Sequence, residues 1–377
     1  MLNQKKSETE YLLHLVFCAL HDEEPKKAEG VDFCALFELA KQQEIYCLIN
    51  EKLQGLDFVC DEAKALFRNQ TLSELNRMIA LGAERKAVFS KLSEKKICFM
   101  PLKGLVFKDY YPKESMRQMS DNDILIDETK RTQAAEIMAE LSYNAYDTTQ
   151  NSDDFFKKPF YTFELHRSLF DENGDFSPRF DDVWKNAKQD EGNEYLYHMG
   201  KEDVYIFSVC HMYKHYIKAC CGIRFLIDNY LFIKKEESSL NWNYIERELD
   251  KHGLFEYENQ TRRLAKAVFE EQELSDYDNK LLESYTDFGL FGNRQGRILQ
   301  DYMHSSGGSK GKTRLKYILH RLFPKRKEII SSYPVLEKAP ILYPFMLIHR
   351  FFKGLFNIRK TTDELKTVEE IQKENRG

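Results

Sequence analysis

Two aspartates, Asp121 and Asp123, stand two residues apart in the segment RQMSDNDILI, whose apolar end is typical of a buried strand. In a strand, residues two apart project from the same face, with Cα atoms roughly 7 Å apart. Both carboxylates can then approach one cation, because Mg²⁺ and Mn²⁺ prefer oxygen ligands and share their coordination shell with substrate phosphates. The spacing therefore predicts a magnesium (or manganese) site with Asp121 and Asp123 as catalytic metal ligands.

A third acid is expected from the segment PFYTFELHRSLF, in which polar and apolar residues alternate as in a strand. The alternation places Thr162, Glu164 and His166 on one face. We expect an adjacent antiparallel strand to bring Glu164 to the aspartates as a metal ligand and catalytic group. An Asp-x-Asp pair alone occurs by chance in many loops, so the combination with a following acidic strand carries the prediction.

A short apolar run, ICFMPLKG, precedes the aspartates and ends in Lys103 and Gly104. A lysine directly after a buried strand and before a glycine stands where a sheet edge opens to ligands, which favours a functional role for Lys103. Arg117 lies four residues before the first aspartate, and its forked guanidinium suits a triphosphate. A solvated loop arginine is the alternative for Arg117.

Three further residues, His166, His211 and Asp228, are candidates to line a cleft. His166 would orient the neighbouring carboxylate or the acceptor, or else be a structural histidine. His211 and His215 have the spacing of a helical transition-metal pair, but no glutamate of an HExxH motif lies between them, which favours a core or cleft role. Asp228 would pair with Arg224 or line the cleft.

The chain as a whole reads as α+β, with a small mixed β-sheet embedded in a predominantly α-helical protein. Apolar residues recur at three and four from residue 8 to about 95 and again after about 170. Between them, strand candidates begin at Ile97, at DNDILID, at NAYDTT and at PFYTFELHRSLF, with a helix in ETKRTQAAEIMAEL. The expected segments are a helical unit at 1–95, the sheet core at 96–170, a helical domain at 171–304 and a basic, aromatic helical region at 313–377, after the linker SSGGSKGK.

Composition limits the function classes. With 61 acidic and 56 basic residues, the net charge of −5 indicates no dedicated nucleic-acid surface. Eight cysteines without a CxxC motif indicate a reduced, cytoplasmic protein, and the N-terminal apolar run is too short to span a bilayer. The C-terminal segment PILYPFMLIHRFFKGLFNIRK allows an interfacial helix, but we expect it to pack on the helical body and not on a membrane.

The segments PLKGLVFKDYYPKESMRQMSDNDILID and FELHRSLF, the helical residues His211, Arg224 and Asp228, and the stretch RLFP with SSYPVLEKAPILYPF carry a resemblance. In order and spacing they resemble a bacterial family of uncharacterised or putative nucleotidyltransferases of the polymerase-beta superfamily. The resemblance implies a polymerase-beta-like nucleotidyltransferase core at 96–170, in which Asp121 and Asp123 bind the metal and Glu164 supplies the third carboxylate. It also implies that the turn of Lys103 and Gly104 binds the phosphates of the nucleotide, through an ammonium and backbone amides. Two departures stand out: the superfamily usually has Gly-Ser at the Lys103-Gly104 turn, and an apolar residue at Asn122.

Two functions remain in view. The first is an enzyme that moves a nucleoside monophosphate from a nucleoside triphosphate to a hydroxyl or phosphate acceptor and releases pyrophosphate. The second is a catalytically slow relative that binds a nucleotide or a partner protein. Three intact acids favour the enzyme, whereas the acceptor is not identified, because a fold does not determine a substrate.

Overall fold

The computed structural model of the chain describes residues 2–149, 151–170, 183–292, 296–297, 335 and 339–347. Contacts divide the chain into two compact units, one of residues 1–213 with 222–286 and the other of residues 214–221 with 287–377. All nine candidate site residues belong to the first unit. The predicted linker and most of the predicted C-terminal region lie outside the described residues, and the four predicted segments stay a prediction.

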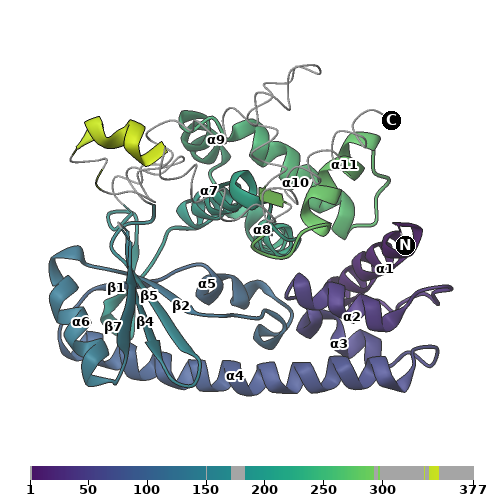
Figure 1. The fold of residues 1–377 in the computed structure, drawn as a ribbon, viewed down its shortest axis with the longest axis horizontal. Helices are drawn as coiled ribbons and strands as arrows, with labels where there is room; N and C mark the ends of the chain where they lie inside the picture. Colours follow the sequence, from purple (N-terminus) through teal and green to yellow (C-terminus); the bar gives the residue numbers. More distant parts are fainter. Residues whose placement is uncertain are drawn as a thin grey trace. The chain divides into compact units, whose positions relative to one another are not determined.

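The N-terminal region is helical, as its apolar spacing predicts. Its helices are α1 (Leu2–His21), α2 (Phe33–Gln42), α3 (Tyr46–Gln54) and α4 (Asp61–Glu94). The Asp32 side chain caps α2 by accepting hydrogen bonds from the backbone N–H groups of Cys34 and Ala35. Helix α4 is long enough to run along the sheet and on past α5 (Gly104–Phe107) to the other N-terminal helices (Figure 1).

A seven-stranded mixed sheet forms the centre of this unit, in the order β3-β4-β5-β2-β1-β7-β6. The strands are β1 (Phe99–Pro101), β2 (Asn122–Ile126), β3 (Asn144–Thr148), β4 (Ser152–Lys157), β5 (Tyr161–His166), β6 (Lys188–Asp190) and β7 (Asn193–His198). This confirms the α+β class and the four predicted strands. Strand β4 and the β6–β7 hairpin were not predicted, so the sheet continues past residue 170, where we expected only helices. Only three residues of β6 precede the Glu-Gly turn, too few for a readable alternation.

The relation between β2 and β5 differs from our expectation, because the two strands are parallel and not antiparallel. The unpredicted strand β4 explains the difference. It pairs antiparallel with both β3 and β5, so the chain reverses once more before it reaches Glu164. The parallel register still sets Asp123 directly beside Glu164.

Helices cover both faces of the sheet. One face packs Phe99, Ile124 and Ile126 against α4 and α6 (Arg131–Glu140). The other packs Met100 and Leu125 against α7 (Lys201–Ala219), α8 (Arg224–Glu236) and α9 (Trp242–Lys251). Because side chains alternate along a strand, Asp123 shares the face of Leu125 and points to the side of the α7–α9 helices.

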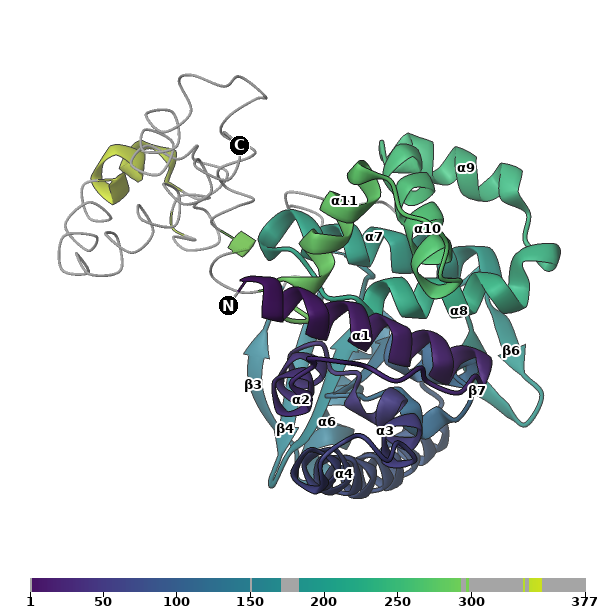
Figure 2. The same cartoon turned by 90° about the vertical axis from the view of Figure 1, so that its right-hand side faces the viewer.

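The remaining elements are α10 (Phe255–Phe269), α11 (Asp276–Thr286) and the short 3₁₀ helices η1 (Lys108–Tyr110), η2 (Glu114–Met116), η3 (Glu128–Lys130), η4 (Glu237–Ser239) and η5 (Pro340–Leu342). Helix α1 packs against α3 and also against α10, so the first and last parts of this unit meet (Figure 2). Over the residues that the structure describes, no helix has the length and apolar character needed to cross a membrane.

Candidate active site

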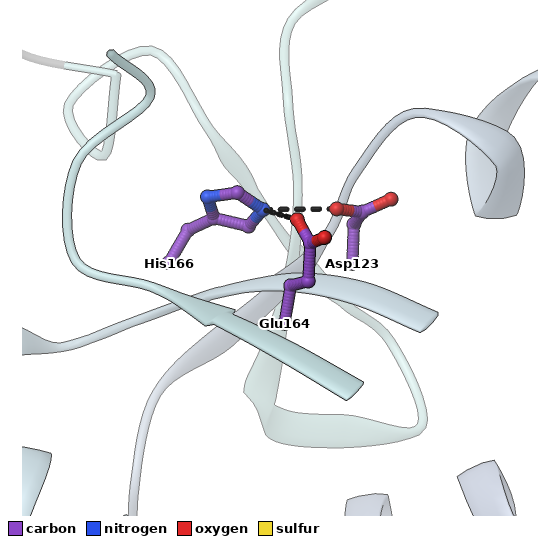
Figure 3. A group of neighbouring side chains, drawn as sticks. All are labelled: Asp123, Glu164 and His166. Carbon is purple, nitrogen blue, oxygen red and sulfur yellow. Dashed lines mark hydrogen bonds and ion pairs between the residues drawn. The ribbon is translucent and has the colours of Figure 1, made fainter. Parts of the chain in front are cut away.

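The centre of the site is a group of three side chains from two neighbouring strands. Asp123 lies on β2, and Glu164 and His166 lie two apart on β5, so all three project from the same face. Their ligand atoms all lie within 4.8 Å of one another. His166 Nε2 is 2.9 Å from Asp123 Oδ1 and 3.3 Å from Glu164 Oε2, so one ring nitrogen faces both carboxylates (Figure 3).

Asp121 directly precedes β2 and is half-buried. Burial and the charges of Asp123 and Glu164 raise the pKa of Asp121 to about 7, although the Lys103 ammonium opposes them. The group of side chains whose ligand atoms lie within 4.8 Å of one another does not include Asp121, so its role as a metal ligand stays a prediction. Asp123 and Glu164 do meet, and their mutual repulsion is largest when no cation lies between them.

Lys103 contacts the acids directly. Its Nζ lies 2.6 Å from Asp123 Oδ1 and 3.4 Å from Glu164 Oε2. These carboxylates raise the pKa of Lys103 above its ordinary value, although burial acts in the opposite direction. We expected Lys103 to contact phosphate, whereas the structure places its ammonium on the predicted metal ligands.

The backbone of Lys103 is strained. Its φ of 47° and ψ of −119° are those of the first central residue of a type II′ turn, where glycine is preferred. The turn is closed by the N–H of Leu105, which donates to the carbonyl of Leu102 at 3.1 Å. A lysine held in this conformation costs about 1–3 kcal/mol, and such strain is concentrated at functional sites.

Charge within the group is strongly coupled. Burial acts to raise the pKa of Asp123, but Lys103 and His166 outweigh it and hold the pKa well below its usual range. Burial and the Lys103 charge act to lower the pKa of His166, but its bonds to Asp123 and Glu164 outweigh them and raise it. The carboxylate of Asp123 is therefore favoured in its ionised form, next to the Lys103 ammonium and the His166 Nε2.

Gly104 and Arg117 lie together, and Asp228 holds the Arg117 side chain in place by two hydrogen bonds. Arg117 is buried, and it donates from Nε to Asp228 Oδ1 at 2.9 Å and from Nη2 to Oδ2 at 2.7 Å. Tyr111 also donates to Oδ1, at 2.8 Å. A Cβ built on Gly104 would lie 2.6 Å from Arg117 Nη1, so the guanidinium occupies the space that only glycine leaves open.

This arrangement changes two expectations. Arg117 is not a solvated loop arginine, and Asp228 pairs with Arg117 in place of Arg224. The Arg224 guanidinium instead contacts Glu44 Oε2, at 2.6 Å. The role of Arg117 in phosphate binding stays a prediction. Its Nη1 is the nitrogen that lies next to Gly104.

Two acids beside the site, Asp154 and Asp147, were not predicted from the sequence. In the strand register, Asp123 is followed across the sheet by Glu164, Asp154 and Asp147, each directly opposite the next. Burial and the charge of Glu164 raise the pKa of Asp154. A register read from the structure is needed to find such a row, because its members lie far apart in the sequence.

His211 and Asn122 have separate surroundings. The ring of His211 stacks on Phe207, with 5.9 Å between the ring centres. Over the described residues, His211 does not belong to the group of side chains that could hold a metal ion.

Asn122 is fully buried on the opposite face from Asp123, and its Oδ1 accepts a hydrogen bond from Arg85 Nη1 at 3.2 Å. Helix α4 thus supplies a donor for the Asn122 oxygen, whereas the buried Nδ2 has no hydrogen-bond partner among the described residues.

The donor set fits a divalent cation. Asp123 and Glu164 offer facing oxygens of the kind that Mg²⁺ and Mn²⁺ prefer. His166 fits less well as a ligand, because a ligating histidine normally donates its other N–H, and the buried Nδ1 of His166 has no partner among the described residues. We therefore regard His166 as a hydrogen-bond donor to the two carboxylates.

Comparison with known families agrees with this geometry. A family model described as uncharacterised nucleotidyltransferase matches residues 29–270, which is more than half of the chain and includes every residue of the site. The chain therefore belongs to this nucleotidyltransferase family. Searches of curated proteins and of solved structures gave no match.

Proposed function

We propose that this chain is a metal-dependent nucleotidyltransferase that moves a nucleoside monophosphate from a nucleoside triphosphate to an acceptor hydroxyl and releases pyrophosphate. The observation that carries the proposal is the register of β2 and β5, which sets the carboxylates of Asp123 and Glu164 side by side within the family's matched region. Asp121, at the start of the same strand, is the third acid.

Each residue has a role in this proposal. Asp121, Asp123 and Glu164 would hold Mg²⁺ or Mn²⁺, which would neutralise charge on the transferring phosphoryl group and lower the pKa of the attacking hydroxyl. The acceptor oxygen forms a bond to the α-phosphorus as the bond to the pyrophosphate oxygen breaks. Glu164 has the more exposed of the two facing carboxylates, with 26% of its side chain accessible, and would accept the hydroxyl proton.

The acidic row supports an acceptor without net negative charge. Asp154 and Asp147 extend the row from Glu164 to the edge strand β3, and Tyr146 on β3 is exposed beside them. Burial and the charges of Asp154, Glu164, Asp121 and Asp147 raise the pKa of the Tyr146 hydroxyl. A polyanion such as RNA would be repelled along this approach, whereas a neutral or amine-bearing alcohol would not.

The experiment uses three isosteric variants, Asp121→Asn, Asp123→Asn and Glu164→Gln. We expect each to abolish Mg²⁺-dependent transfer of α-labelled nucleotide to an acceptor in cell extract, because each removes a charge that the cation requires. Asp57→Asn is the matched control, since Asp57 is exposed and lies outside the site. A site variant that transfers label at the rate of the control removes that residue from the mechanism.

The alternative, a slow binding module, makes a different prediction. Such a protein would bind the metal and nucleotide with the same residues, but the wild-type chain would transfer no label. Measuring nucleotide binding and label transfer on one preparation separates the two functions.

A further inference from the structure

Lys103 binds the same two oxygens that would hold a divalent cation. Asp123 Oδ1 and Glu164 Oε2 face each other, and Lys103 Nζ lies 2.6 Å from the first and 3.4 Å from the second. No other ion pair of Lys103 occurs within the described part of the chain. The ammonium is thus the internal counter-ion of this carboxylate pair.

An ammonium and a divalent ion cannot both remain there. An ion such as Mg²⁺ binds carboxylate oxygens at about 2.0–2.1 Å and requires a nearly regular shell of ligands. Lys103 Nζ already lies against Asp123 Oδ1, so a bridging ion would meet a positive charge at contact distance. Metal binding to this pair therefore requires the Lys103 side chain to leave it.

A displaced Lys103 needs another anion, and its backbone position indicates where. Lys103 is the residue just before α5, in the turn beside Gly104 and Arg117 Nη1. Its four-carbon side chain is flexible and ends in a compact charge, which suits a move between partners a few ångströms apart. Lys103 is itself the first central residue of this turn, so its side chain starts beside Gly104 while its ammonium reaches the acids.

We propose that Lys103 exchanges partners during each binding cycle: it neutralises Asp123 and Glu164 in the metal-free protein, and it moves to the triphosphate when metal and nucleotide bind. This inference rests on the proposed metal and triphosphate site. Its consequence is cooperativity, because nucleotide offers the displaced ammonium a new partner. Metal alone binds weakly, and metal and nucleotide each strengthen the binding of the other by the same factor.

The test measures Mn²⁺ binding directly, by electron paramagnetic resonance of free Mn²⁺, with and without a triphosphate analogue that has a methylene bridge between the α and β phosphorus atoms. In the wild type, the analogue is expected to raise Mn²⁺ affinity. In Lys103→Met, Mn²⁺ alone is expected to bind at least tenfold more tightly than in the wild type, and the gain from the analogue is expected to fall at least tenfold.

Two further variants make the result specific. Lys103→Gly also removes the ammonium, and it relaxes the strained turn, so it keeps the test valid if Lys103→Met folds poorly. Both variants are expected to show the same change in Mn²⁺ affinity. Lys157→Met is the matched control, because Lys157 forms an ion pair with Glu84 at 2.9 Å, away from the site, and it should bind Mn²⁺ as the wild type does.

Unchanged or weaker Mn²⁺ binding in the folded Lys103 variants would overturn the exchange of partners. This outcome differs from failure of the proposed function, which would appear as tight binding of Mn²⁺ and analogue without transfer of label by the wild type. Label transfer together with unchanged Mn²⁺ affinity in Lys103→Gly would refute only the exchange.

Discussion

The ion pair between Arg117 and Asp228 allows a quantitative test of how the turn at Lys103 and Gly104 is supported. Both side chains are 7% exposed, and two parallel hydrogen bonds join them. The substitution Asp228→Ala would leave a buried guanidinium without its counter-ion and the Tyr111 hydroxyl without its acceptor. Breaking such a pair costs about 3–5 kcal/mol, since the remaining charge stays buried and unpaired.

The assay is the free energy of unfolding in urea at pH 7. The matched control is Glu51→Ala, which breaks the pair between Lys113 and Glu51, whose side chains are 58% and 62% exposed. Exposed pairs contribute about 0–1 kcal/mol, so the control should lose little stability. An Asp228→Ala protein that loses no more than the control would refute the reasoning.

A double variant separates the buried charge from the packing. Arg117→Met with Asp228→Leu removes both charges and keeps apolar volume, so it should recover much of the stability that Asp228→Ala loses. If Arg117 Nη1 contacts phosphate, the double variant should still bind nucleotide poorly. A double variant that recovers both stability and nucleotide binding would limit Arg117 to a structural role.

The remaining predictions concern the acids and the turn. Asp121→Asn should stabilise the metal-free protein, because the pKa of Asp121 is raised to about 7 in the folded state. The carboxyl of Asp121 therefore destabilises the fold increasingly from about pH 4 to about pH 7, and by a constant amount at higher pH. A difference in stability between variant and wild type that is the same at pH 4 and pH 8 would contradict this. Asp123→Asn should instead lower stability at pH 7 in the same denaturation assay, because Asp123 pairs with two donors. Gly104→Ala should cost about 1–3 kcal/mol and weaken nucleotide binding, because the new Cβ would lie 2.6 Å from Arg117 Nη1. Gly82→Ala, whose Cβ would meet its nearest neighbour at 3.6 Å within α4, is the control and should be neutral or stabilising; equal effects at both glycines would refute the close approach.

Local patterns were enough to predict part of this site. The alternation of FELH placed Glu164 and His166 on one face, as the strand β5 has them. The spacing of Asp121 and Asp123 predicted that both approach one cation; the structure brings Asp123 to Glu164 and His166, and the role of Asp121 stays a prediction. These features depend on the two-residue repeat of a strand, which is a property of the backbone and can be read from a few neighbouring residues. The helical character of the N-terminal region is of the same kind.

Tertiary structure decided the partners. Whether β5 runs parallel or antiparallel to β2 depends on the intervening strand β4, whose polar start hides it in the sequence. The pairing of Arg117 with Asp228 joins residues 111 positions apart, and the contact of Lys103 with the acids depends on a turn conformation that lysine disfavours. The sequence by itself determined which carboxylates are candidates to bind a cation, because that follows from residue type and local periodicity. Only the packed sheet decided which cationic group lies on them, because that depends on burial and on charges brought together from distant segments.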